Sequence, residues 1–380
     1  MVLIALVGKP NVGKSTLFNA MTGGSANVAN YPFTTIDPNK GVGFVESKCP
    51  CKSLGVACNP NNSKCANGTR LVPINVIDVA GLVEGAHEGK GLGNKFLSDL
   101  SQAEALVIVA DASGNTDGAG NPAEGHDVLK DVEIVEKELE QWFYEVLKRN
   151  LDKNKGKKLQ ELAQSLSGLR ITEQDLHDCL REKGEDASKW TKQEEKQLAL
   201  QLLHKTKPFA IAANKADSPN AKENTQKLGE KYANVFPTAG DLHLALRKAV
   251  EKGLCDFDGK KIIAKTKDEK IISALRKIQA FLDQQTTGVQ DLLNHLAFDQ
   301  LGYMVVYPVE DEHKYANHFG KILPDAILLK KNSTPVQLAE AVHSDLAKGF
   351  LYAIDAKKKM RISKDHALQE GDVVKIVSAR

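Results

Sequence analysis

The sequence has few cysteines for its length, almost no net charge and no long uninterrupted apolar run. Six cysteines in 380 residues are too few for a disulfide-built scaffold and indicate a reduced, cytoplasmic protein. A formal charge of +2 gives no argument by itself for a nucleic-acid or membrane partner. No apolar segment approaches the length of a transmembrane helix. These absences leave a globular chain of two or three domains, in which 42% hydrophobic residues can fill real cores.

The N-terminal run VLIALV is short and has no basic leader, so it predicts a buried strand rather than a signal peptide. It leads into GKPNVGKST, which fits the P-loop pattern G-x-x-x-x-G-K-[ST] between a strand and a helix. We expect backbone N–H groups and the helix N-terminus to hold phosphates, with Lys14 reaching the β- and γ-phosphates and Ser15 binding Mg²⁺. The predicted nucleotide-binding residues of this loop are Gly8, Pro10, Asn11, Val12, Gly13, Lys14, Ser15 and Thr16.

A second strand pattern, LVPINVID, predicts the other side of the phosphate site. It ends at Asp78, and Gly81 follows three residues later. The Asp78 carboxylate is expected to hold a Mg²⁺-bound water, and the Gly81 N–H to face a γ-phosphate.

Two later segments predict recognition of the base. PFAIAANKAD ends a strand with Asn214, Lys215 and Asp217. Because a carboxylate accepts two hydrogen bonds at once, Asp217 suits the N1–H and 2-amino group of guanine and repels the N1 acceptor of adenine. VFPTAG predicts a weaker backbone contact to the guanine O6, with a register uncertain by one residue, from Thr238, Ala239 and Gly240.

The order of these motifs resembles the GTPase domain of the Obg/YchF family, in the translation-factor-related class of P-loop proteins. YPFTTIDPNKG and DVAGLVEGAHEGKGLGNKFL are similar to the switch I and switch II segments of that family. The resemblance implies that Thr35, rather than Thr34, engages Mg²⁺ and the γ-phosphate. The predicted catalytic set is then Lys14, Thr35 and Gly81, and the predicted magnesium set is Ser15, Thr35 and Asp78.

The position after Gly81 predicts slow hydrolysis of GTP. Many relatives carry a glutamine there that orients the attacking water, but Leu82 has no donor or acceptor. The resemblance implies the same, because Obg/YchF proteins carry a hydrophobic residue there and are thought to rearrange or borrow a catalytic group. His87 either approaches the water or is an exposed loop histidine. Asn11 stands where K⁺-activated members place an asparagine that ligates a K⁺ ion between the phosphates.

A cysteine-rich insert occupies residues 47–69. Four thiols in seventeen residues, separated by turn-forming residues, suit a tetrahedral Zn²⁺ site. One residue alone separates the first two cysteines, which makes both harder to fit at one metal without strain. Zinc, reduced unligated thiols and a redox-sensitive disulfide remain open for Cys49, Cys51, Cys58 and Cys65. Most family members have a shorter connection here, so the resemblance assigns the insert no role.

Hydrophobic periodicity predicts an α/β fold with added helices. The P-loop GTPase domain, with a mostly parallel sheet, is expected over residues 1–126 and 207–301, the latter with connecting helices. A helical insertion is expected over 127–206, beginning with an amphipathic helix, in the position of the helical arm of YchF proteins. Residues 302–380 show short strands and a helix that begins at Thr334–Pro335, and they resemble a TGS domain, a small β-grasp module.

These features predict a GTP-binding protein that hydrolyses GTP to GDP and phosphate as a regulatory switch. By resemblance, the TGS domain and the helical insertion imply contact with the ribosome or structured RNA, and no membrane. The charge supports this only modestly, because residues 301–380 hold twelve Lys or Arg against ten Asp or Glu. Their one dense basic hairpin is Lys357, Lys358, Lys359 and Arg361.

Two alternatives stay open. The first is an ATP-binding ATPase, because some YchF proteins bind ATP where their base motif departs from N-K-x-D. The second is an RNA or protein adaptor without catalysis, whose bound nucleotide is structural.

Overall fold

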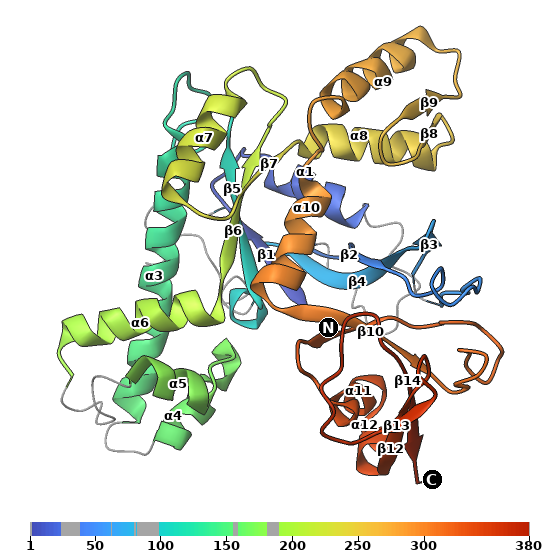
Figure 1. Ribbon diagram of the computed structural model, residues 1–380. Helices are drawn as coiled ribbons and strands as arrows, with labels where there is room; N and C mark the ends of the chain where they lie inside the picture. The colour runs from blue at the N-terminus through green and yellow to red at the C-terminus, as the bar shows by residue number, and fades with distance from the viewer. Residues whose placement is uncertain are drawn as a thin grey trace.

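The computed structural model describes residues 2–23, 39–61, 63–79, 81, 99–154, 159–180 and 190–379. Its centre is a sheet with the strand order β2-β4-β1-β5-β6-β7, to which β3 adds by pairing with β4 (Figure 1). The strands run parallel except β2 and β3, which are antiparallel to β4. Their bounds are β1 Leu3–Val7, β2 Lys40–Lys48, β3 Cys65–Ala66, β4 Thr69–Asp78, β5 Ala105–Asp111, β6 Phe209–Asn214 and β7 Val235–Thr238.

Helices cover both faces of the sheet, and its middle strands β5 and β6 are accordingly apolar up to the polar residues that end them, Asp111 and Asn214. All seven residues of β5 are buried, and successive side chains point to opposite faces. One face packs against α3 (Val128–Lys153), α6 (Lys192–Thr206) and α7 (Ala221–Lys231). The other packs against α1 (Lys14–Thr22), α8 (Gly240–Glu251) and α10 (Val289–Asn294).

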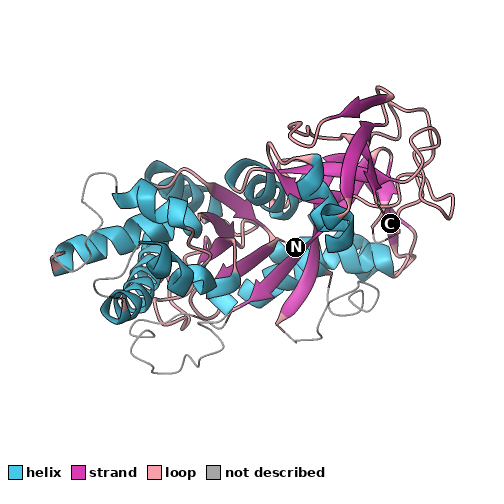
Figure 2. Cartoon of the chain, turned by 90° about the horizontal axis from the view of Figure 1, so that it is seen from below, coloured by secondary structure: helices cyan, strands magenta, loops and turns pink. Residues whose placement is uncertain are grey.

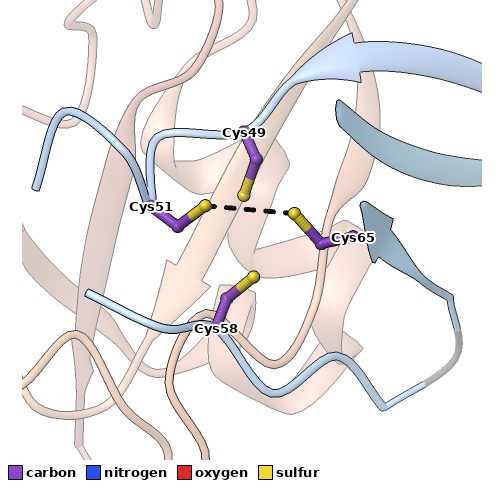
Figure 3. A group of neighbouring side chains, drawn as sticks. All are labelled: Cys49, Cys51, Cys58 and Cys65. Atoms are coloured by element: carbon purple, nitrogen blue, oxygen red, sulfur yellow. Dashed lines mark hydrogen bonds between the residues drawn. The ribbon is translucent and has the colours of Figure 1, made fainter. Parts of the chain in front are cut away.

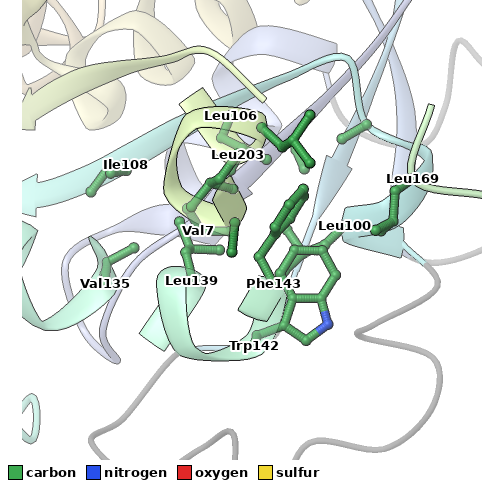
Figure 4. Close-up of a cluster of buried hydrophobic side chains, with 14 of the residues drawn as sticks. Val7, Leu100, Leu106, Ile108, Val135, Leu139, Trp142, Phe143, Leu169 and Leu203 are labelled. Carbon is green, nitrogen blue, oxygen red and sulfur yellow. The ribbon is translucent and has the colours of Figure 1, made fainter. Parts of the chain in front are cut away.

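The helical insertion is built on α3, and its predicted apolar face is confirmed. The side chains of Val135, Leu139 and Phe143 are buried in one cluster with Leu106 and Ile108 of β5 (Figure 4). Asp127 begins the helix by accepting a hydrogen bond from Leu129 N. Beyond α3 lie α4 (Leu159–Leu166), the 3₁₀ helix η3 (Ser167–Leu169), α5 (Glu173–Leu180) and α6.

A small unit of helices and a hairpin follows β7. The predicted helix near residues 268–283 is α9 (Glu269–Leu282), which begins at Asp268. The hairpin of β8 (Cys255–Phe257) and β9 (Ile262–Ala264) is not predicted from the sequence, because its strands are too short to show periodicity. After α10 the chain continues in a π-helical turn, His295–Gln300.

The C-terminal residues form a second sheet, ordered β11-β10-β14-β12-β13. The predicted helix start is confirmed: Thr334 and Gln337 form a capping box, and Pro335 takes the first helical position. Figure 2 shows this β-rich domain at one end of the molecule and the helical insertion at the other. Its elements are β10 Tyr303–Val309, β11 Ile327–Lys330, α11 Pro335–Val342, α12 Ser344–Lys348, β12 Phe350–Asp355, β13 Met360–Ile362 and β14 Val373–Ser378.

None of the described helices combines the length and apolarity needed to span a membrane.

The buried ammonium of Lys207 gives the fold a pH dependence. Its Nζ donates to Ser101 O at 2.6 Å and Ala103 O at 2.5 Å, and burial lowers the pKa of Lys207 from 10.5 to about 7. Between these two values the unfolded chain holds the proton and the folded chain does not, so stability should rise with pH. We expect the free energy of unfolding to rise by at most about 1.4 kcal/mol per pH unit in this window, and Lys207→Met to remove that rise.

Urea unfolding followed by tryptophan fluorescence measures this effect, because both tryptophans, Trp142 and Trp190, belong to the predicted helical insertion. Lys192→Met is the matched control, since Lys192 is an exposed lysine at the start of α6. It should keep the wild-type slope. Equal slopes in the wild type and Lys207→Met would contradict the assignment.

Candidate nucleotide-binding site

The P-loop lies between the carboxyl end of β1 and the first turn of α1, and two glycines are required there. A Cβ on Gly8 would lie 2.6 Å from Val109 O in β5. Gly13 has φ +85°, and a Cβ there would lie 2.5 Å from Asn214 Nδ2. No side chain caps α1 and its first turn holds no acidic residue. The helix N-terminus therefore keeps the N–H groups that suit an anion.

Asp78 meets the P-loop because β4 runs parallel to β1, with Leu6 and Asp78 in register. Lys14 Nζ pairs with Asp78 Oδ1. Ser15 Oγ donates to Asp78 Oδ2 at 2.6 Å. A hydroxyl and a carboxylate oxygen side by side are ligands that Mg²⁺ prefers. The fold thus brings together two of the three predicted magnesium residues.

Gly81 also lies beside the P-loop. A Cβ on it would be 3.3 Å from Pro10 N and Pro10 Cγ, so its backbone is close to the predicted phosphate site. The predicted switch residues Thr34, Thr35, Leu82 and His87 lie outside the described residues.

Asn214 connects two loops of the site. Its Nδ2 donates to Val12 O at 2.9 Å, and its Oδ1 accepts from Gly240 N at 3.2 Å and Thr238 Oγ1 at 3.3 Å. The side chain is buried at the end of β6, so each of these bonds satisfies a group away from water. Asn214 therefore holds the P-loop and the β7–α8 loop in a common arrangement.

The N–H groups of the β7–α8 loop are engaged within the protein. Ala239 N donates to Thr287 O at 2.9 Å, and Gly240 N donates to Asn214 Oδ1. The loop's placement next to Asn214 agrees with a site for a base, while the contact to the guanine O6 stays a prediction.

Lys215 and Asp217 take opposite roles. Lys215 has φ +63° and its Nζ donates to Asp111 Oδ2 at 2.8 Å and to Asn11 O at 3.1 Å. Burial alone would raise the pKa of Asp111, but hydrogen bonds from Lys215, Ser113 and Thr116 lower it below its ordinary value. Asp217 is exposed, and within the described ranges its carboxylate has no hydrogen-bond partner. Lys215 thus builds the site, and Asp217 presents a carboxylate.

A polar layer beneath the P-loop is missed by sequence reasoning. Lys9 Nζ pairs with Asp131 Oδ1 at 2.7 Å, both side chains being fully buried, and it also donates to Thr116 O and Asp117 O. The signal is present: Asp131 lies three residues after Val128 and four before Val135, within the apolar stripe of α3. A carboxylate in such a stripe needs a buried cation, but the sequence does not say which one.

The loop after β5 covers the P-loop from one side. Asn11 has φ +62°, and its Nδ2 donates to Gly120 O at 2.9 Å. A Cβ on Gly120 would lie 2.6 Å from Pro10 O. This bond orients the Asn11 amide, whose Oδ1 is the atom with the chemistry of a K⁺ ligand.

The four cysteines of the insert come together in a separate cluster, with all four ligand atoms within 4.8 Å of one another. Spacing of one residue does not prevent Cys49 and Cys51 from joining it, because residues 51–55 form a turn after Pro50.

The sheet, the P-loop and the facing Asp78 define a P-loop GTPase domain. Comparison with family models supports this: one described as "50S ribosome-binding GTPase" matches residues 3–155. One described as "Obg-like GTPase YGR210-like, G4 motif-containing domain" matches residues 212–311, and a TGS domain model matches residues 320–378.

Individual relatives extend over the whole chain. A GTP-binding protein of Methanocaldococcus jannaschii is 48% identical, covering 100% of both chains. The crystal structure of a GTP-binding protein from Pyrococcus horikoshii is 36% identical, covers 100% of both chains and has a TM-score of 0.79. The ribosome-binding ATPase YchF of Bacillus subtilis is 28% identical over 97% of each chain. The chain belongs to the Obg/YchF family of P-loop GTPases.

The buried pair under the P-loop can be tested on one helix. Asp131→Asn leaves the Lys9 ammonium buried without its counter-charge, so we expect a loss of about 3–5 kcal/mol in the free energy of unfolding. Glu133→Gln, also on α3, removes an exposed pair with Lys231 at 2.8 Å and should cost less than about 1 kcal/mol. Denaturant unfolding of both variants gives the comparison; equal small losses would show that Lys9 does not depend on Asp131.

Proposed function

We propose that this protein is a guanine-nucleotide switch that binds GTP with Mg²⁺ and hydrolyses it slowly. One observation supports the proposal most directly: residues of the base motif are hydrogen-bonded to the backbone of the P-loop. Asn214 and Lys215 donate to backbone carbonyls of Val12 and Asn11, and Asp217 follows in the same exposed loop. A ligand held by both segments must carry phosphates and a base.

The choice of base is assigned to Asp217. Its carboxylate has acceptor capacity without a donor, which matches the N1–H and the 2-amino group of guanine. Adenine offers an acceptor at N1 and no 2-amino group, so it loses both bonds. This argument favours GTP over ATP by the loss of paired hydrogen bonds, which is the strongest form of discrimination a polar site offers.

Hydrolysis is assigned to the phosphate side. Mg²⁺, when bound, supplies positive charge against the phosphate oxygens, and Ser15 and Asp78 are the described residues that would hold it, with Thr35 as the predicted third. Lys14 stabilises charge on the transferred phosphate. Leu82 cannot orient the attacking water, so the intrinsic rate is low. Asn11 is proposed to hold a K⁺ ion through Oδ1.

ATP is a second candidate nucleotide, because relatives of this chain are named ATPases.

The Bacillus subtilis relative is also named ribosome-binding, and we propose a ribosome or structured RNA as the partner here, in the cytoplasm. The TGS domain is the proposed contact. Two lysines of its basic hairpin, residues 357–361, already have partners within the protein. Lys358 pairs with Asp355 at 3.3 Å, and Lys359 lies over the Tyr315 ring. RNA contact is therefore not assigned to this hairpin alone.

Base selection is tested with Asp217→Asn. The wild type should bind GTP far more tightly than ATP. In Asp217→Asn an amide N–H₂ replaces one acceptor, which opposes the 2-amino group of guanine but suits the 2-carbonyl of xanthine. We expect GTP affinity to fall by about tenfold or more and affinity for xanthosine triphosphate to rise, as measured by calorimetric titration of nucleotide-free protein.

Asp256→Asn is the control, because it removes an exposed carboxylate of the β8–β9 hairpin and should leave both affinities unchanged. Tighter binding of ATP than GTP by the wild type would overturn the assignment of Asp217 and favour the ATPase candidate.

The switch is tested by GTP turnover in K⁺ or Na⁺ buffer, with and without ribosomes. We expect slow turnover alone, faster turnover in K⁺, and further stimulation by ribosomal particles. Asn11→Ala should lose the K⁺ effect and keep the Na⁺ rate, whereas Asn220→Ala, an exposed asparagine before α7, should behave as the wild type. Equal rates in both salts would remove K⁺ from the proposal, and turnover absent under every condition would favour the adaptor.

A further inference from the structure

The cysteine insert gathers its four thiols around one point. Cys49 follows the end of β2, Cys51 lies in a turn, Cys58 lies in a segment without regular secondary structure and Cys65 is in β3. Figure 3 shows the four sulfurs pointing toward one another from these separate segments. All lie within 4.8 Å of one another, and Cys51 Sγ and Cys65 Sγ are 3.9 Å apart.

Backbone hydrogen bonds hold these segments in place. Cys49 N donates to Gly68 O at 2.8 Å, and Val56 N donates to Cys51 O at 3.0 Å. β3 pairs with β4 through Cys65 and Arg70. Cys49 and Cys51 are buried, and Cys58 and Cys65 are half-buried. The convergence of the thiols is therefore part of a built structure.

The distances suit a tetrahedral metal centre. Four thiolates at about 2.3 Å from a zinc ion are about 3.8 Å apart from one another, close to the separation of Cys51 and Cys65. A disulfide would join two of the sulfur atoms. It would not explain why the other two cysteine sulfurs lie equally close. Four sulfurs that are all mutual neighbours fit one shared metal ion.

A buried arginine on the neighbouring strand links the insert to the C-terminal domain. Arg70 is the cross-strand neighbour of Cys65 and is fully buried. Its guanidinium donates to Pro324 O at 2.9 Å, and Nε and Nη1 have no hydrogen-bond partner among the described residues. A buried charge without a counter-ion is costly. The guanidinium also lies over the Tyr307 ring, with Cζ 5.8 Å from the ring centroid, so the strand that carries Cys65's neighbour is anchored in the C-terminal domain.

The cluster also lies where the C-terminal domain meets the GTPase domain. Asn59 N donates to Ile322 O at 2.8 Å, and Asn61 N donates to Pro324 O at 2.9 Å. Cys49 and Cys51 pack in one apolar cluster with residues of β10, including Tyr307. Asn59 and Asn61, which follow Cys58, thus contribute backbone bonds to the contact with the C-terminal domain, beside side-chain bonds such as Ser47 Oγ to Glu370 at 2.6 Å.

We propose that Cys49, Cys51, Cys58 and Cys65 bind one Zn²⁺ ion, and that this centre holds the C-terminal domain against the GTPase domain. Binding replaces the four thiol protons with the metal, and all four sulfurs keep their oxidation state. Because the site lies outside the nucleotide site, it goes beyond the function proposed above.

The metal content of the purified full chain tests the proposal. After expression with zinc in the medium, elemental analysis should find about one zinc per chain in the wild type, and the Cys58→Ser and Cys65→Ser variants should lose most of it. Cys179→Ser is the matched control, since Cys179 is a half-buried cysteine of α5, and it should keep the zinc. When Co²⁺ replaces zinc, the wild type should show the absorption of a tetrahedral thiolate complex. The Cys58→Ser and Cys65→Ser variants should not show it.

A second measurement tests the docking role. It uses the wild type, so it does not depend on whether the cysteine variants fold. Hydrogen exchange after removal of zinc from the wild type should speed up at the amides of Asn59 and Asn61 while the P-loop helix stays protected. Absence of zinc together with no tetrahedral Co²⁺ spectrum in the reduced protein would overturn the site. A Cys51–Cys65 disulfide in the native protein, found by mass spectrometry, would do so as well. Unchanged exchange at both amides would overturn the docking role.

Discussion

The side-chain amide of Asn214 is the interaction on which the nucleotide site depends. It bonds both to the P-loop, through Val12 O, and to the β7–α8 loop, through Gly240 N. The close approach of Asn214 Nδ2 also explains why residue 13 must be glycine. Since the amide is buried, breaking either bond leaves an unsatisfied polar group. The geometry of one loop therefore constrains the geometry of the other.

Buried charges extend this constraint away from the site. Lys215 ties Asn11 to Asp111, and Lys9 ties the P-loop to Asp131 of α3. The same helix has 26 residues, so it extends roughly 40 Å from the P-loop side into the helical insertion. A continuous rigid element thus joins the phosphate loop to the far end of the insertion. Helix α3 is therefore a direct physical link between the proposed nucleotide site and the surface of the helical insertion.

Much of this organisation was predictable, because it rests on local signals. The P-loop pattern between a strand and a helix, the apolar face of α3 and the Thr334–Pro335 helix start all express short-range rules of backbone and burial. Other features depend on which distant segments meet. The β8–β9 hairpin has strands of three residues each, and the partner of Asp131 is more than a hundred positions away in the chain. Periodicity within a segment carries no information about such partners.

The sequence by itself determined the class of protein and the residue types of the nucleotide site, because phosphate and base recognition require particular groups at short, fixed spacings. The tertiary structure decided which of those groups point outward and which serve the fold. Lys215 and Asn214 belong to the base motif but bond to the P-loop, whereas Asp217 is exposed. The tertiary structure also decided whether the four cysteines of the insert come together. Spacing alone disfavoured a common centre for Cys49 and Cys51, and the folding of β2, the turn and β3 brings all four sulfurs to one point. The physical reason is that a side chain's role follows from its burial and its partners, and both are set by contacts between segments far apart in the chain.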